Sequence, residues 1–128
     1  MDRQHWVKKS NPASPKVLDD LFSLIREATG DDRLALKYNK HYIGLEVDGA
    51  AMNFVTFMPR KAHVIMTIRL PQTKETDDQL EDAALDTLTY ETQWRQYRLR
   101  LESQLDAKQH ELLLRLIRQA RESRGKSA

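Results

Sequence analysis

The stretch from Leu36 to Leu70 constrains the fold more than any other, because it contains three runs of alternating apolar residues separated by turn residues. Alternation with a period of two is typical of β-strands that bury one face. Asp48-Gly49 follows the first run and is a common hairpin turn, and Pro59-Arg60-Lys61 follows the second. The runs occupy positions 41–47, 52–58 and 63–70. They predict neighbouring strands of one antiparallel sheet.

Helical periodicity flanks these strands. Apolar residues recur every three or four positions over 15–29, where Ser14 and Pro15 mark a helix start and Gly30 marks its end. The other expected elements are a strand at 33–39, a helix from 76 or 77 to about 86, a strand at 96–101 and a helix from 106 to 121 or beyond. The pattern predicts an α+β domain with an antiparallel sheet of about four or five strands and helices packed on one face.

The chain length of 128 residues suits one domain with one core. We expect a flexible N-terminal arm at 1–14, a single domain at 15–122 and a frayed tail at 123–128. No apolar run approaches the roughly 20 residues of a transmembrane helix, and the N-terminus lacks the apolar core of a signal peptide. The absence of Cys excludes disulfides and thiolate chemistry. These features favour a cytoplasmic protein with no membrane partner.

The net charge of +2 is small, but the charge is unevenly distributed. Residues 32–71 and 94–128 are basic, whereas residues 72–93 are acidic. Acidic residues near the start of the predicted helix at 76 or 77 are favoured by the helix dipole, so much of the acidic segment has a structural explanation. The two basic segments are therefore the more informative ones about a partner.

Cationic, amide and aromatic side chains gather where the first two runs of the sheet meet. If these runs pair through the turn at 48–51, one group lies at one end of the sheet: Lys37, Tyr38, Asn39, Lys40, Tyr42, Asn53, Arg60 and Lys61. Cations beside aromatic rings suit a phosphate with a stacked base, or another anionic group. The structural alternative is that Tyr and Lys are favoured on exposed edge strands, where Lys prevents aggregation.

A second group of cations is expected on the sheet face opposite the helices, together with Tyr42. Arg98 and Arg100 alternate with apolar residues in the last strand, and Arg69 closes the third run. If the last strand lies on the same side of the sheet as that run, these cations converge and would contact phosphates without reading sequence. The alternative is that they pair with the acidic segment 75–86 and are neutralised within the chain.

The sequence contains no recognisable catalytic motif. The four His residues are scattered, and the sequence has no Gly-rich phosphate loop and no nucleophile elbow. The order of elements does match the core of the PD-(D/E)xK nucleases, which hold a metal ion with carboxylates and a nearby Lys. Glu46 and Asp48 are available here, but no Lys follows at the third position. We expect no catalytic residue, no metal site and no cofactor.

Several of these segments together resemble a bacterial domain family of unknown function that is sometimes labelled "predicted transport protein". The resemblance covers about residues 15–120 and rests on Tyr38-Asn39-Lys40, Ile43-Gly44-Leu45, Asn53-Phe54-Val55, Phe57, Pro59-Arg60-Lys61 and Tyr97-Arg98-Leu99-Arg100-Leu101. Modules similar to these occur alone or at the C-terminal ends of larger proteins, including ATP-binding proteins and restriction-type nucleases. The resemblance implies an accessory or nucleic-acid role and no established activity.

The sequence favours a non-enzymatic binding module that engages nucleic acid or another polyanion through a basic and aromatic sheet face. One alternative is a module for protein–protein interaction or homodimerisation that uses Trp6, the exposed sheet face or an edge strand. A further alternative is a degenerate or active nuclease of the PD-(D/E)xK type.

Overall fold

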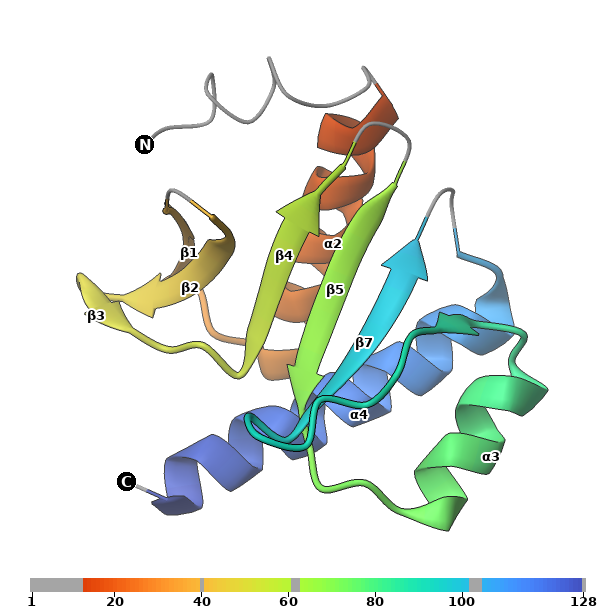
Figure 1. Ribbon diagram of the computed structural model, residues 1–128. Helices are drawn as coiled ribbons and strands as arrows, with labels where there is room; N and C mark the ends of the chain where they lie inside the picture. Colours follow the sequence, from red (N-terminus) through yellow and green to blue (C-terminus); the bar gives the residue numbers. More distant parts are fainter. Residues whose placement is uncertain (1–12, 40, 61–62, 102–104, 128) are drawn as a thin grey trace.

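The three alternating runs form strands of one antiparallel sheet, which is seen from its helix-free side in Figure 1. The computed structural model describes residues 13–39, 41–60, 63–101 and 105–127. In chain order the elements are α2 (Ala13–Thr29), β1 (Leu34–Tyr38), β2 (Ile43–Val47), β3 (Ala50–Ala51), β4 (Val55–Pro59), β5 (Val64–Arg69), α3 (Lys74–Asp82), β6 (Asp86–Thr87), β7 (Gln96–Leu101) and α4 (Ala107–Ser127). The predicted α+β class is confirmed.

The sheet is seven-stranded in the order β1-β2-β4-β5-β7-β6, with β3 paired to β2. The expected number of strands was too low, because β3 and β6 have 2 residues each and are too short for alternation to be visible. β2 and β4 pair only at Ile43 and Phe57. The hairpin of β1, β2 and β3 therefore forms a wing beside the β4–β5–β7 part of the sheet, and we call it the wing below (Figure 1).

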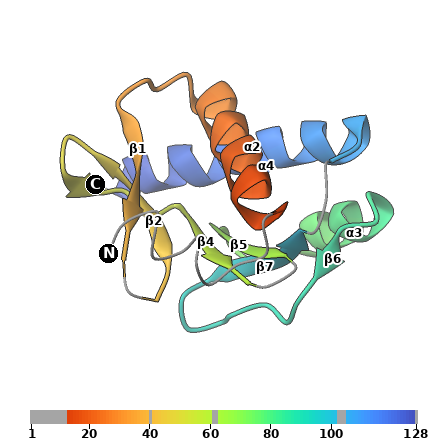
Figure 2. The ribbon, with the colours of Figure 1, turned by 90° about the horizontal axis from the view of Figure 1, so that it is seen from above.

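The hydrophobic core lies between the sheet and two helices. Phe57, Met66 and Leu99 lie opposite one another on adjacent strands, and all three are 0% exposed. On the same side, α2 and α4 contact each other and cross, and together they cover this face of the sheet (Figure 2). Their apolar stripes are buried there, as Ile25 and Leu113 illustrate. The prediction that the first and last helices share one face is confirmed.

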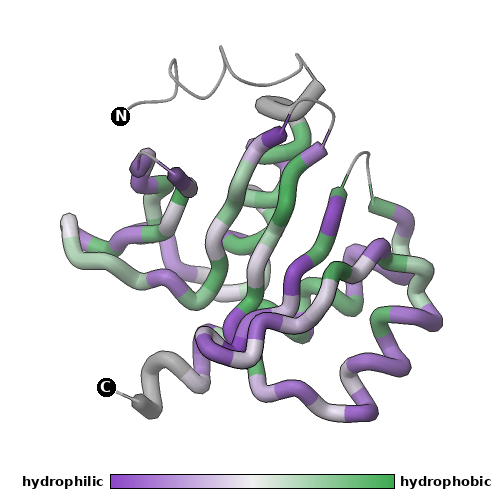
Figure 3. The backbone as a smooth tube through the Cα atoms, in the orientation of Figure 1, coloured by the Kyte–Doolittle hydropathy of each residue, from purple (hydrophilic) through white to green (hydrophobic). Residues whose placement is uncertain are grey.

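The remaining helix, α3, lies at the margin of the sheet rather than on its face. Figure 3 shows mainly hydrophobic colouring along β4 and β5, and a largely hydrophilic α3. Only Leu80 of α3 is buried. The Tyr97 hydroxyl fixes the start of this helix. It accepts a hydrogen bond from the Thr73 amide (3.0 Å) and donates one to the Asp77 carboxylate (2.9 Å).

Several element boundaries differ from the predicted ones. α3 begins earlier than expected because Thr73, and not Thr76 or Asp77, is its N-cap: the Thr73 hydroxyl accepts from the amide of Thr76 (3.1 Å). It also ends earlier, at Asp82, and Ala84 just beyond it has a positive φ of 57°. α4 continues to Ser127, into the range expected to be a frayed tail. Trp6 and most of the predicted arm lie outside the described residues. Among the residues that the structure describes, no helix is both long and apolar enough to cross a membrane.

Candidate functional site

The sheet face opposite α2 and α4 carries three rows of side chains, set by the strand register. The first row joins Met58, Ile65 and Arg100, the second joins Thr56, Thr67 and Arg98, and the third joins Arg69 and Gln96. Within these three strands, none of the described positions on this face is acidic. Figure 1 shows no described helix in front of β4, β5 and β7. We call this surface the open face.

The register brings together the three arginines that the sequence placed on this face. Arg69 lies directly opposite Gln96, so Arg98, two residues further along β7, is its diagonal neighbour. Neither Arg69 nor Arg98 has a side-chain hydrogen bond or ion pair among the described residues. Arg100 pairs with Asp86 of β6, at a distance of 3.7 Å between nitrogen and oxygen. The predicted neutralisation by the acidic segment therefore applies to Arg100 alone of these three.

The wing places a different set of predicted residues together. Tyr42 and Asn53 both lie over Gly44, since a Cβ added at Gly44 would be 2.4 Å from Asn53 Oδ1 and 3.2 Å from a Tyr42 ring carbon. Asn53 Oδ1 accepts a hydrogen bond from the amide of Leu45 (3.0 Å). This bond gives the Leu45 amide a partner at a position where β2 is no longer paired with β4. Lys37 is the cross-strand partner of Gly44 and is exposed. Asn53 thus has a structural role beside its predicted binding role.

The remaining predicted residues do not join either group. Tyr38 is the partner of Ile43 and packs partly buried against the core, on the opposite side from Lys37. Asn39 shapes the β1–β2 turn by donating from its side-chain amide to the carbonyl of Lys37 (3.2 Å). Arg60 is exposed in the β4–β5 turn. Lys40 and Lys61 lie outside the described residues.

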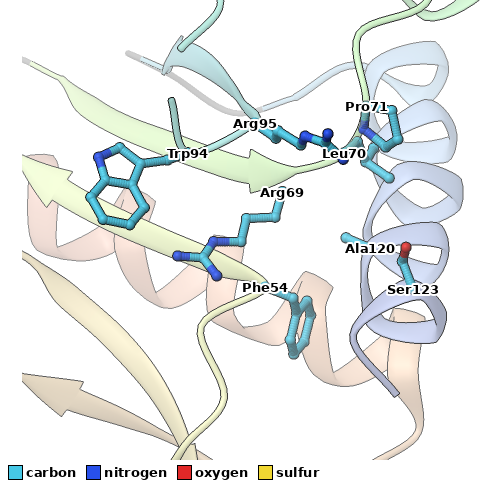
Figure 4. A pocket seen from close by; sticks show the side chains of 8 residues that line it. All are labelled: Phe54, Arg69, Leu70, Pro71, Trp94, Arg95, Ala120 and Ser123. Atoms are coloured by element: carbon cyan, nitrogen blue, oxygen red, sulfur yellow. The ribbon is translucent and has the colours of Figure 1, made fainter. Parts of the chain in front are cut away.

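A pocket of about 240 Å³ lies at the end of β5, and two of its lining residues are outside the predicted site. Trp94 and Arg95, from the turn before β7, line it together with Arg69 and with Phe54, as the close view shows (Figure 4). The Nε atom of Arg69 is buried there without a hydrogen-bond partner among the described residues. Residues 87–94 show neither helical nor strand periodicity, so only the unassigned Trp in a basic segment could have indicated this pocket.

Carboxylates lie at the margins of the open face and not at its centre. Glu46 is on the same side of the wing as Lys37, opposite Ala35, and Asp48 is in the β2–β3 turn with a positive φ of 53°. Asp48 lies 4.0 Å from the guanidinium of Arg33. Within the described ranges, no group of three or more His, Cys, Asp or Glu side chains is placed to hold a metal ion.

The fold and the site together describe an α+β domain with one cationic, helix-free sheet face. Comparisons of the chain with protein-family models, curated proteins and solved structures find no match. Any function must therefore be inferred from the residues of this chain and their arrangement.

Proposed function

We propose that this chain is a non-enzymatic binding module whose open face engages nucleic acid or another polyanion. The observation that supports the proposal most is the placement of Arg69 and Arg98 as diagonal neighbours with no acidic partner within the described part of the chain. Two uncompensated guanidinium groups at this spacing repel each other, and a bound anion relieves that repulsion. Arg100 extends the same surface, with part of its charge offset by Asp86.

Several cations on one sheet face fit a polyanion better than a single small anion. Thr56 and Thr67, in the middle row, hydrogen-bond to each other through their hydroxyl groups, and Thr67 is 6% exposed. The two threonines therefore pack closely in the middle row of this face. Phosphate contacts of this kind position a nucleic-acid backbone and carry no sequence information.

The proposal is tested by fluorescence anisotropy of labelled DNA and RNA, single- and double-stranded, titrated with the protein at about 50 mM and about 200 mM salt. If three arginines each neutralise one phosphate, the affinity for duplex falls about 40-fold between these salt concentrations, and that for single strands about 20-fold. The absence of binding at the lower salt concentration would overturn the proposal. Light scattering of the same samples would then test the interaction or dimerisation alternative.

A further inference from the structure

The turn that carries Trp94 is held in place by backbone hydrogen bonds at both ends. Glu91 and Gln96 exchange two of them, at 2.9 and 3.0 Å between nitrogen and oxygen, which closes the turn 92–95. The carbonyl of Arg95 accepts from the amide of Leu70 (3.1 Å), which ties the turn to the end of β5. Despite this anchoring, the Trp94 side chain is 57% exposed. A large aromatic surface is thus presented to solvent from a fixed backbone.

Interactions inside the molecule hold the segment before this turn as well. The Tyr90 hydroxyl donates to the carbonyl of Leu70 (2.5 Å), and its ring packs edge-on against that of Tyr97, with centroids 4.9 Å apart. Because Tyr97 is buried, this contact joins the turn segment to the core. The position of Trp94 is therefore set by the folded sheet, and little ordering is needed when a ligand binds.

The surroundings of Trp94 are cationic. Arg69 and Arg95 line the same pocket, with the guanidinium of Arg69 on the side of Trp94 and Phe54, and that of Arg95 directed toward Leu70 and Pro71 (Figure 4). The buried, unpartnered Nε of Arg69 is a donor that lacks an acceptor among the described residues. An exposed indole beside the guanidinium of Arg69 matches a ligand with a flat ring and an attached anionic group.

We propose that this pocket binds an unpaired nucleotide of single-stranded nucleic acid, with its base stacked on Trp94 and its phosphate contacted by Arg69. This inference rests on the proposed function and adds a preference for single strands. Both faces of a base within a duplex are already stacked, so only an unpaired base is free to lie on the indole. From the pocket, Arg98 and Arg100 continue along β7 with a rise of about 6.8 Å for every two residues, so the backbone of the same strand is expected to follow β7.

The test compares Trp94→Ala with Gln93→Ala, its exposed neighbour in the same turn, as a matched control. Loss of one stacked base lowers affinity for single strands about tenfold, and duplex affinity stays within about twofold. Trp94→Phe retains most of the affinity, because a smaller ring still stacks, and Gln93→Ala leaves both affinities unchanged. Equal losses for single strands and duplex in Trp94→Ala would overturn the inference.

Tryptophan fluorescence provides a second readout that does not depend on removing Trp94. The chain has 2 Trp residues, so Trp94 is the only one left in a Trp6→Phe background. Its fluorescence is expected to be quenched by single-stranded oligonucleotides and not by duplex of the same length. Salt-dependent binding of both forms without quenching would overturn the stacking inference and leave the proposed function standing. No binding of either form would overturn both.

Discussion

Replacing Arg69, Arg98 and Arg100 together by Gln is expected to lower affinity for nucleic acid roughly 100-fold at low salt. The expectation follows from their shared surface, since even about 1 kcal/mol for each lost charge-assisted contact adds up to about 3 kcal/mol. The salt dependence should decrease at the same time, by about one unit of slope for each phosphate contact removed. Anisotropy titrations of the variant and the unmodified protein over a range of salt concentrations measure both quantities.

A matched variant separates the effect of this surface from the effect of net charge. Arg26, Lys74 and Arg115 are exposed cations on α2, α3 and α4, and changing all three to Gln removes the same charge away from the open face. This variant should retain nearly all of the affinity. If both triple variants lost affinity equally, the interaction would be a general response to net charge, and the open face would not be the site.

The largest expected effect on stability is that of Tyr97→Ala. The Tyr97 side chain is 2% exposed, lies on the helix-covered side of β7 and holds the start of α3 through its hydroxyl. Truncation of a buried aromatic residue costs about 3–5 kcal/mol in free energy of unfolding. This loss is a large share of the roughly 5–15 kcal/mol that stabilises an ordinary domain. Urea denaturation followed by circular dichroism measures the loss.

Tyr97→Phe keeps the ring and removes only the hydroxyl. We expect a loss of about 1–2 kcal/mol, because the amide of Thr73 and the carboxylate of Asp77 lose a partner. Burial raises the pKa of the Tyr97 hydroxyl above its usual value of 10.0. The folded protein therefore holds this proton more tightly than the unfolded chain, and stability that is present below about pH 10 is lost as the pH rises further. That alkaline loss should be smaller in Tyr97→Phe, and an equal loss in both proteins would contradict this assignment.

The alternation of apolar residues predicted the strands of the central sheet, and in β4 and β7 the burial alternates as well, whereas β5 is buried on both faces along most of its length. In β7, Tyr97, Leu99 and Leu101 are buried, and the alternate positions Arg98 and Arg100 are on the open face. In β2, Ile43, Leu45 and Val47 are buried as the alternation predicts, although Gly44 between them is buried as well. A period of two therefore determined both the element and the face on which each side chain lies.

Only some of the candidate site residues could be grouped correctly from the sequence. Residues that are close in sequence can lie on different faces of the sheet. Lys37 and Tyr38 are adjacent in the chain, yet the register of β1 places them on opposite sides of the sheet. The Trp94 turn was missed for another reason. Its shape depends on the bridge between Glu91 and Gln96 and on the hydrogen bond between Arg95 and Leu70, and these contacts leave no periodic signature in the sequence.

Mapping the contact by NMR would show whether the open face is the binding surface. A ¹⁵N-labelled sample titrated with a short single-stranded oligonucleotide reports on backbone amides, arginine Nε–H groups and the Trp94 indole at once. We expect the largest chemical-shift changes at Arg69, Trp94 and Arg98, with small changes along α2 and α4. Changes concentrated on those helices, with the signals of β5 and β7 unmoved, would contradict it.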